Sequence, residues 1–397
     1  MKAYVIGTCD TKARELCYVR DLLRAQGLET VLVNVGIKGG DEVADVRASD
    51  VAIRHPDGPA AVFVNDRGTA VVAMAEALRA YILEQQDLGG VIGLGGSGGS
   101  GIIAPALQAL PVGLPKILVS TLASGDVSAY VGPSDVNMFH PVTDVSGLNR
   151  VSRKVLGNAA HALAGMMTWQ PPAATGEKPS LALSMFGVTT PAVQAMTETL
   201  EGDYDCLVFH ATGQGGRAME QLILQGDIQG VLDITTTEIC DLLVGGVLSA
   251  GEERLDSIAK TKVPYVGSCG ALDMVNFWSP DSVPKRFAGR LFHHHNAQVT
   301  LMRTSPQECA RIGEWIAAKL NACEGPLHFL LPLHGVSALD IEGGPFHDPE
   351  ASAALFDALE LGLQQSEHRR LVKLDCHIND PAFAAAAVAA FREISGA

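Results

Sequence analysis

Residues 91–100 read VIGLGGSGGS, a short apolar run that breaks into five glycines and two serines. The amphipathic stretch 101–110 follows, so the pattern predicts a strand, a tight loop and a helix. Glycines let the main chain adopt positive φ and let a ligand approach bare amides. Those amides and the amino-terminal end of the helix behind them form a positively polarised donor surface. The natural ligand of such a loop is a phosphate or a carboxylate.

The same glycines fit one standard nucleotide motif and miss another. Gly93, Gly95 and Gly98 match GxGxxG, the dinucleotide-binding pattern, which requires an acidic residue about 20 residues later, at the end of the next strand. The next predicted strand, residues 116–121, ends in serine and threonine instead. The phosphate loop of P-loop enzymes requires a lysine after the glycines, and none is present. The segment therefore favours an anion site of neither kind, with a tight turn between strand and helix as the alternative.

Composition indicates a two-domain α/β protein. The chain has 397 residues, 47% of them hydrophobic and 5% aromatic, with 42 glycines. This length exceeds one ordinary core, and the composition suits Val/Ile/Leu strands with Ala/Leu helices. The formal charge is −15 without a block of lysine or arginine, which argues against nucleic acid or a membrane as the main partner. A small anion can still bind through local amides.

Cysteine usage and hydropathy predict a soluble, cytoplasmic protein. The eight cysteines are scattered without CxxC spacing, as expected of reduced thiols. Met1 and Lys2 run directly into a predicted strand, leaving no room for a signal peptide, and no run of 18 apolar residues occurs.

The first half alternates strand and helix patterns. The predicted strands cover residues 2–7, 30–35, 91–95 and 116–121, and the helices cover 13–26, 67–83, 101–110 and 151–167. Residues 45–59 stay unassigned, and 136–149 has room for one more strand. Residues 169–180 have the composition of a linker, so we divide the chain into domains 1–175 and 180–397.

The second half repeats the alternation. The predicted strands cover residues 181–186, 206–210, 230–234, 263–266, 327–331 and 371–375. Helices are predicted after Thr190-Pro191, over 218–225 and over 306–321, where Ser305 and Glu308 form a capping box. The exit loop ATGQGGR again places glycines before a helix. The predicted fold is therefore α/β: two doubly wound, Rossmann-like lobes with mostly parallel sheets, a cleft between them, and ligands at the carboxyl ends of the strands.

In the first half, groups that could hold a nucleoside triphosphate follow the strands. They are Thr8, Asp10, Thr11, Lys12, Gly93, Gly95, Gly96, Ser97, Gly98, Gly99, Ser100, Thr121, Gly125 and Asp126. Hydroxyls and amides bind phosphate oxygens, lysine neutralises them, and aspartate can hold Mg²⁺. The alternative is that residues 8–11 only cap the first helix.

In the second half, candidate catalytic residues also follow the strands. They are His210, Arg217, Asp233, His334 and His377, with Glu238 as a further acid. An arginine beside a helix amino terminus can clamp an anion, and histidines can act as general acids or bases. Each histidine alone is more often a hydrogen-bonded structural residue, and it is their shared placement after strands that favours the group. Asp348-Pro349 and Asp380-Pro381 look like helix caps rather than catalytic aspartates.

Two further motifs favour structure over chemistry. In His293-His294-His295 only the outer two residues share a face of a strand, and no HExxH or Cys/His spacing accompanies them, so no metal ligand set is predicted. Cys269 lies between glycines in GSCGALD, which favours a buried thiol in a tight turn over a nucleophile.

Seven motifs together resemble a known family. They are TCDTKARE (from Thr8), GLGGSGGS (from Gly93), TLASGD (from Thr121), GQGGRAME (from Gly213), DITTTEI (from Asp233), GALDMVNF (from Gly270) and LDCHINDPAF (from Leu374). The sequence resembles the bacterial and plant family that includes the tomato mosaic virus resistance protein, whose amino-terminal region is an ATP-binding domain that inhibits tobamovirus RNA replication. Antiviral inhibition belongs to particular plant members and is not carried over to this chain.

The resemblance implies two α/β lobes, ATP and Mg²⁺ in the amino-terminal lobe, and self-association as a homodimer or higher homo-oligomer. It assigns the nucleotide role to Thr8, Asp10, Thr11, Lys12 and residues 93–100. Plant relatives carry a further TIM-barrel-like domain. Because this chain stops at Ala397, we expect that domain to be absent or to be a separately encoded partner.

These observations favour an ATP-binding enzyme of small-molecule metabolism. ATP phosphates would lie on residues 95–100 with Lys12, and a second, anionic substrate would lie across the cleft near Arg217, His210 and His377. Phosphoryl transfer or ATP-driven activation consists largely of such positioning and charge neutralisation. One alternative is an ATP-independent hydrolase, lyase or isomerase that uses the histidines or a metal. The other is a regulatory protein that binds nucleotide without turnover.

Overall fold

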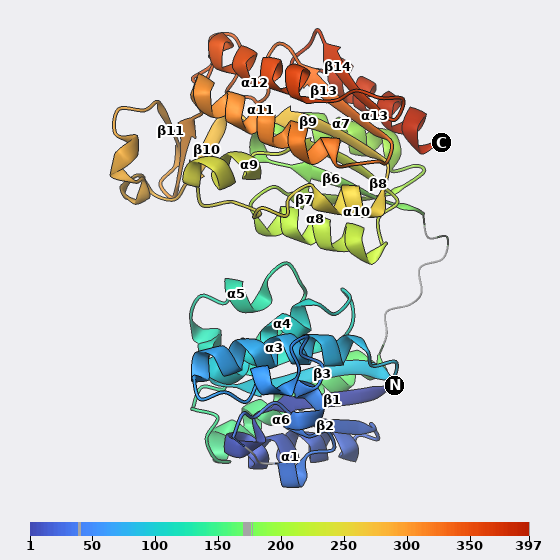
Figure 1. Ribbon diagram of the computed structural model, residues 1–397, viewed down its shortest axis with the longest axis vertical. Helices are drawn as coiled ribbons and strands as arrows, with labels where there is room; N and C mark the ends of the chain where they lie inside the picture. Colours follow the sequence, from blue (N-terminus) through green and yellow to red (C-terminus); the bar gives the residue numbers. More distant parts are fainter. Residues whose placement is uncertain (39–40, 170–175, 177, 397) are drawn as a thin grey trace. The chain divides into compact units, whose positions relative to one another are not determined.

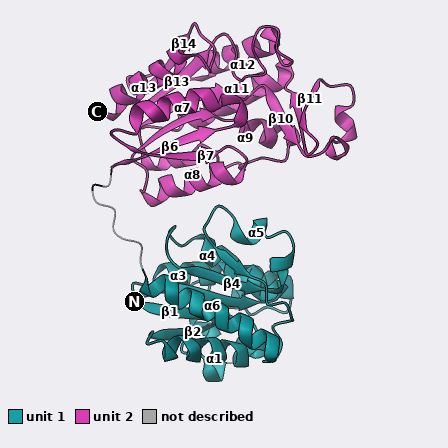
Figure 2. Cartoon of the chain, turned by 180° about the vertical axis from the view of Figure 1, so that it is seen from behind, with its two compact units in different colours: residues 1–173 teal, residues 174–397 magenta. Residues whose placement is uncertain are grey.

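The computed structural model describes residues 1–38, 41–169, 176 and 178–396. The chain forms two compact units, Met1–Ala173 (unit 1) and Ala174–Ala397 (unit 2) (Figure 2). The linker predicted over residues 169–180 falls largely on positions outside the described residues. Each unit has its own sheets and core.

Unit 1 is built on a five-stranded parallel sheet with the order β2-β1-β3-β4-β5 (Figure 1). The strands are β1 (Lys2–Gly7), β2 (Thr30–Asn34), β3 (Leu88–Gly95), β4 (Lys116–Ser120) and β5 (Asn137–Phe139). The helices are α1 (Cys9–Ala25), α2 (Ala48–Ala52), α3 (Arg67–Leu83), α4 (Ser97–Gln108), α5 (Ser128–Val131) and α6 (Arg150–Thr168), with 3₁₀ turns at Asp41–Val43, Pro59–Ala61 and Thr121–Ser124.

Alternation along the strands of unit 1 produces two cores, one on each face of the sheet. Tyr4 and Ile6 point to the face covered by α2, α3 and α4. Ala3 and Val5 point to the opposite face, which α1 and α6 cover. Successive strand residues face opposite sides, so a sheet buried on both faces needs a nearly continuous apolar run.

Two helices of unit 1 start earlier than the pattern predicts. α4 begins at Ser97, inside the glycines, and α1 begins at Cys9, so the predicted exit loop forms the first helical turn. Glycine disfavours helix by about 1 kcal/mol per residue relative to alanine, which is why the sequence pattern pointed to a loop. The early starts place both helix amino termini directly at the ends of β1 and β3.

Unit 2 contains a six-stranded parallel sheet with the order β14-β13-β9-β8-β6-β7 (Figure 1). The strands are β6 (Ser180–Met185), β7 (Asp205–His210), β8 (Gly230–Thr235), β9 (Tyr265–Gly270), β13 (Leu327–Pro332) and β14 (Arg369–Leu374). The helices are α7 (Thr190–Leu200), α8 (Gln214–Gln225), α9 (Glu238–Cys240), α10 (Asp256–Thr261), α11 (Pro306–Asn321), α12 (Pro349–Gly362) and α13 (Pro381–Ser395). A π-helical turn, Asp241–Gly245, follows α9, and 3₁₀ turns occur at Gly187–Thr189, Pro280–Ser282 and Lys285–Phe287.

Two helical layers cover the sheet of unit 2. The core on one face joins β-strand side chains to α8, α10, α11 and α12. The core on the other face joins the sheet to α7 and α13. The predicted capping box is present at the start of α11, where the Ser305 hydroxyl accepts from the amide of Glu308 at 3.3 Å.

A small antiparallel sheet in unit 2 was not predicted. It has the order β10-β12-β11, with β10 (Met274–Phe277), β11 (Phe292–Asn296) and β12 (Val299–Arg303). Met274 and Leu301 of this sheet pack in a separate cluster with Val188, Ala271 and Phe346. Because Val188 and Ala271 follow β6 and β9, this sheet lies over the carboxyl ends of the large sheet.

The two units share one strand order, and this confirms the doubly wound fold. β2-β1-β3-β4-β5 in unit 1 corresponds to β7-β6-β8-β9-β13 in unit 2. In each sheet the first strand along the chain (β1 or β6) lies beside the third (β3 or β8), and the order of the strands runs in opposite directions on the two sides of this pair. Doubly wound sheets bind ligands at this switch point. The glycine loop of unit 1 follows β3, at this switch point, whereas the glycine loop of unit 2 follows β7, at the sheet edge. The predicted repetition is therefore only partial.

Candidate functional site

A pocket of about 450 Å³ lies at the switch point of unit 1. Nine predicted residues line it: Thr8, Asp10, Thr11, Lys12, Gly96, Ser97, Gly98, Gly99 and Thr121. The exits of β1 and β3 come together here because these two strands are neighbours in the sheet. Parallel strands thus bring segments 80 or more residues apart in the chain to one edge.

The exit of β1 is held by a side chain that the sequence analysis did not single out. Asn34, at the end of β2, accepts from the amides of Cys9 at 2.9 Å and Gly36 at 2.8 Å. Thr8 and Thr11 share a hydroxyl hydrogen bond of 2.8 Å, and the Lys12 ammonium donates to the carbonyl of Val145. The first turn of α1 is therefore fixed from both sides.

The amino terminus of α4 has no side-chain cap. Its N-cap residue is Gly96, and the first helical hydrogen bond runs from Ser100 N to Gly96 O at 2.8 Å. The amides of Ser97, Gly98 and Gly99 have no carbonyl acceptor among the described residues. Uncapped amides at a helix amino terminus form an anion site because they carry partial positive charge and point outward.

Six pocket residues escaped the sequence analysis. They are Ile37, Lys38, Arg67, Val71, Ile102 and Asp144. Arg67 starts α3, and a Cβ added at Gly98 would lie 3.2 Å from its Nη2, so its guanidinium reaches the first turn of α4. Lys38 follows β2, so its position after a neighbouring strand could have identified it as a pocket residue. Asp144 lies in residues 136–149, for which the sequence suggested only a further strand.

The pocket therefore combines cations, carboxylates and hydroxyls. Lys12, Lys38 and Arg67 contribute positive charge, while Asp10 and Asp144 contribute negative charge. The Asp10 Oδ1 atom is buried and has no hydrogen-bond partner among the described residues. Such a carboxylate oxygen fits a cation that it could share with phosphate oxygens, as Mg²⁺ sites commonly do. The arrangement suits a polyanion accompanied by a divalent ion.

The remaining predicted nucleotide residues lie outside the pocket lining. A Cβ at Gly93 would lie 2.6 Å from Ile103, and one at Gly95 would lie 2.4 Å from the amide of Ser100, so both glycines permit α4 to pack on β3. Ser100 is fully buried and shares a 2.7 Å hydrogen bond with Ser120.

Gly125 and Asp126 are exposed beyond the 3₁₀ turn that follows β4. Asp126 accepts from the amide of Ser128 at 2.9 Å, and hydrogen bonds from Ser128 lower the pKa of its carboxyl. Their role is local: Asp126 stabilises the start of α5.

In unit 2, the predicted anion loop is filled by the protein's own carboxylate. Glu238 accepts from the amides of Gly213 at 2.6 Å and Gly216 at 3.1 Å. A Cβ at Gly216 would lie 2.1 Å from the Glu238 carboxylate, which explains the glycine there. Glu238 is 1% exposed, and this burial raises the pKa of its carboxyl against the opposing effect of Arg254. No external anion can take that place.

Asp233 belongs to the same buried network and is a structural residue. Arg254 donates to both of its oxygens at 2.7 Å and to Glu238 at 3.0 Å. Tyr265 donates a further hydrogen bond of 3.0 Å to Asp233. Asp233 has no exposed surface, so it cannot contact a substrate in this arrangement. The predicted catalytic role of Asp233 is therefore not supported by its surroundings.

The other predicted catalytic residues separate to opposite edges of the sheet. His210 ends β7, at one edge, and its ring packs edge-on against Phe186 with centroids 5.4 Å apart. Burial lowers the pKa of His210. Arg217 donates to the carbonyls of Ser249 and Ala250, both at 3.1 Å. His334 and His377 follow β13 and β14, at the other edge, so the predicted cluster does not form.

His334 and His377 line a second pocket, of about 590 Å³, at that edge. The His377 Nδ1 accepts from the amide of Asn379 at 3.1 Å, so its Nε2 carries the proton and donates to the carbonyl of Ser337 at 2.9 Å. Both ring nitrogens thus hold the loop. His334 Nε2 lies 2.9 Å from Asp375, and both side chains are exposed.

The switch point of unit 2 is filled by packed side chains. Thr189 and Thr235, which follow β6 and end β8, share a hydroxyl hydrogen bond of 2.7 Å. Both are fully buried, and Val188 is 8% exposed beneath the small sheet. The equivalent position in unit 1 is the open pocket described above.

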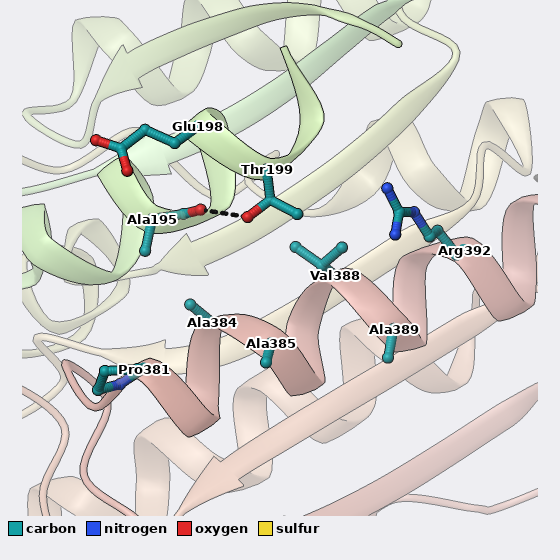
Figure 3. A pocket seen from close by; sticks show the side chains of 9 residues that line it. All are labelled: Ala195, Glu198, Thr199, Pro381, Ala384, Ala385, Val388, Ala389 and Arg392. Carbon is teal, nitrogen blue, oxygen red and sulfur yellow. Dashed lines mark hydrogen bonds between the residues drawn. The ribbon is translucent and has the colours of Figure 1, made fainter. Parts of the chain in front are cut away.

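A larger groove in unit 2 lies away from the carboxyl ends of the strands. It measures about 710 Å³ and lies between α7 and α13 (Figure 3). Its lining includes several alanines and two charged side chains, Glu198 and Arg392, and Thr199 donates to the Ala195 carbonyl at 2.8 Å. The groove lies on the helical face rather than at the strand ends, so size alone does not identify the site.

The metal and nucleophile motifs have structural surroundings. His293, which lies in β11, packs edge-on against Phe346, with ring centroids 6.1 Å apart. Among the described residues, no three His, Cys, Asp or Glu side chains are grouped to hold a metal. Cys269 belongs to β9 rather than to a turn, and complete burial raises the pKa of its thiol well above the ordinary value.

The described helices are all too short or too polar to cross a lipid bilayer.

Comparison with known proteins identifies the family. Residues 1–172 match "Uncharacterised protein family (UPF0261) N-terminal domain", and residues 178–395 match the C-terminal domain of the same family. A UPF0261 protein of Rhizobium meliloti (strain 1021) is 57% identical over 395 residues, 99% of each chain. The ToMV resistance protein Tm-1(GCR237) of Solanum lycopersicum is 43% identical over 421 residues, covering 99% of this chain and 56% of the tomato protein. The chain belongs to the UPF0261 family.

Among solved structures, the UDP-GlcNAc 2-epimerase of Methanocaldococcus jannaschii is 9% identical, with a TM-score of 0.22 over 67% of this chain and 83% of that one.

Proposed function

We propose that this member of the UPF0261 family binds ATP with Mg²⁺ in the switch-point pocket of unit 1 and uses it for phosphoryl transfer or for activation of a second substrate. The carrying observation is the uncapped amino terminus of α4, which shares the pocket with Lys12, Lys38 and Arg67. Several cations and free amides at one point favour a polyanion over a single carboxylate.

The protein groups divide naturally among the parts of such a ligand. Ser97, Gly98 and Gly99 would donate main-chain hydrogen bonds to phosphate oxygens, while the three cations would neutralise their charge. Asp10 and Asp144 would hold Mg²⁺, which supplies further neutralisation of the phosphates. Ile37, Val71 and Ile102 provide an apolar surface for the base.

The end of β4 supports a nucleotide other than NAD. The dinucleotide pattern needs an acidic side chain there to bind the ribose. In this chain that position holds Ser120, which is fully buried and hydrogen-bonded to Ser100. We therefore expect no preference for NADH.

The test is calorimetric titration of the full chain with ATP and MgCl₂, with NADH as the comparison ligand. We expect ATP to bind with micromolar affinity, about −8 kcal/mol, and NADH to show no binding. Absence of ATP binding would overturn the proposal. Phosphate release during incubation with candidate second substrates then separates turnover from binding alone.

Gly98→Val provides the matched variant. Its side chain would project beside Arg67, into the space that the phosphates need, so we expect ATP binding to be lost while the melting temperature stays within a few degrees. Gly101→Ala is the control, because Gly101 lies on the same helix as Gly98. A Cβ at Gly101 meets only Val71 of α3, at an ordinary 3.8 Å. Unchanged ATP affinity in Gly98→Val would remove α4 from the site.

A further inference from the structure

The second pocket, at the carboxyl ends of β13 and β14, has a charge opposite to that of the unit 1 pocket. Glu342, Asp340 and Asp380 line it together with three histidines, and no lysine or arginine is among its lining residues. Within the described residues, neither Glu342 nor Asp380 forms an ion pair. An anion would therefore be repelled there, which disfavours the anionic substrate expected near His377.

The cation beneath this pocket is already engaged. Arg303 is 4% exposed and donates to the carbonyl of Phe346 at 2.7 Å and the hydroxyl of Thr304 at 2.9 Å. It also lies 3.5 Å from Asp340, whose second oxygen accepts from Val336 and Ser352. Arg303 thus balances Asp340. Asp380 accepts from the amide of His377 at 2.8 Å, and among the described residues no cation is paired with Asp380 or Glu342.

The same pocket has an apolar wall. Leu333 is 39% exposed and Ile341 is 47% exposed, although both are large aliphatic side chains, and the buried Phe356 also lines the pocket. Apolar surface next to a few polar groups is the ordinary composition of a small-molecule site. The wall would bury the hydrocarbon part of a ligand, and the carboxylates would select its charge.

We propose that this pocket binds a small organic cation, with a protonated amine near Glu342 and Asp380 and an apolar portion against Leu333, Ile341 and Phe356. This is a site separate from the nucleotide pocket of unit 1. Attraction between opposite charges and repulsion between like charges makes the preference for a cation over an anion the defining property.

Three probes of matched shape test this preference. Phenethylamine is a cation at pH 8, 2-phenylethanol is neutral, and phenylacetate is an anion. In titrations of the full chain followed by NMR, we expect millimolar binding of phenethylamine, at least threefold weaker binding of 2-phenylethanol, and no binding of phenylacetate. Equal or tighter binding of phenylacetate would overturn the proposal. So would no binding of phenethylamine at about 20 mM, a concentration near the weakest dissociation constant expected for so small a ligand.

A variant locates the binding in this pocket. Glu342→Gln should weaken phenethylamine binding about threefold, in line with an exposed charge, and leave 2-phenylethanol unchanged. Glu350→Gln, an exposed residue in the first turn of α12 outside the lining, should keep the affinity for both. Unchanged phenethylamine affinity in Glu342→Gln would contradict the assignment. ATP titration of the same variant should match the unaltered chain, so failure here leaves the nucleotide proposal standing on its own test.

Discussion

At the residue scale, Glu238 determines the role of the glycine loop of unit 2. Its carboxylate accepts from Gly213 and Gly216, and Arg254 joins it to Asp233. A buried arginine with several carboxylates needs every partner, because an uncompensated buried charge is costly. These residues hold β8 to its neighbouring segments and are better described as structural than as catalytic.

Asp233→Asn tests that description. Asparagine has one oxygen where Asp233 offers two to Arg254, so one charge-assisted hydrogen bond of the buried pair is lost, and we expect the free energy of unfolding of unit 2 to fall by about 3 kcal/mol, measured by urea denaturation. Asp227→Asn, at an exposed position, should change it by less than about 0.5 kcal/mol. Full stability with loss of turnover in Asp233→Asn would restore the catalytic interpretation.

Arg67 is the residue that the structure adds to the proposed nucleotide site. Its guanidinium reaches the first turn of α4, so Arg67→Gln should weaken ATP binding about tenfold, as expected for loss of one charge-assisted hydrogen bond. Arg79→Gln lies on the same helix, exposed and outside the pocket, and should bind ATP normally. Calorimetry with equal affinities for both variants would show that Arg67 does not contact the ligand.

At the element scale, the loops after β9, β12 and β13 are joined by a buried carboxyl network. Ser337 donates to Asp273 at 2.7 Å, and the other oxygen of Asp273 is buried without a partner among the described residues. Arg303, at the end of β12, is the nearby cation. Burial raises the pKa of Asp273 above its ordinary 3.8, and the negative charge of Asp340 raises it further.

This shift makes stability depend on pH in a definite direction. As pH rises above about 4, where this carboxyl ionises in the unfolded chain, the folded chain keeps a proton on Asp273 that the unfolded chain releases, so stability falls as pH rises. We expect Asp273→Asn to reduce the loss of unfolding free energy between pH 5 and pH 8 by at least about 1 kcal/mol. Asp281→Asn, at an exposed position, should retain the original pH dependence. Identical pH profiles for both variants would contradict the raised pKa.

At the scale of the whole molecule, the two units share a strand order but differ at the switch point of the sheet. In unit 1 the switch point is open and lined by cations and free amides. In unit 2 the switch point is packed with Thr189, Thr235 and Val188 beneath the small antiparallel sheet. A shared fold therefore does not imply a shared site, because the residues at the strand ends decide its chemistry.

Separate cores predict that unit 1 is sufficient for nucleotide binding. Residues 1–169 expressed alone should fold, and calorimetry should give an ATP affinity within about threefold of the full chain's, since each unit buries its own apolar side chains. The same fragment with Gly98→Val is the control. A folded fragment that fails to bind ATP would indicate that residues of unit 2 are needed.

Most of the helices and strands could be predicted from the sequence, because the signals for them are local. The limits of α3, the cap at Ser305 and the doubly wound class all follow from hydrophobic period and capping residues within a few positions. The sequence also indicated part of the unit 1 pocket that we propose binds a nucleotide, since Thr8 to Lys12 and Gly96 to Gly99 immediately follow strands.

Which strand ends meet could not be predicted from the sequence, because strand order in a sheet is a long-range property. The tertiary structure placed His210 and His377 at opposite edges, brought Lys38 and Arg67 to the glycine loop, and filled the second loop with Glu238. No local pattern encodes these outcomes, since each depends on packing between segments that are distant along the chain.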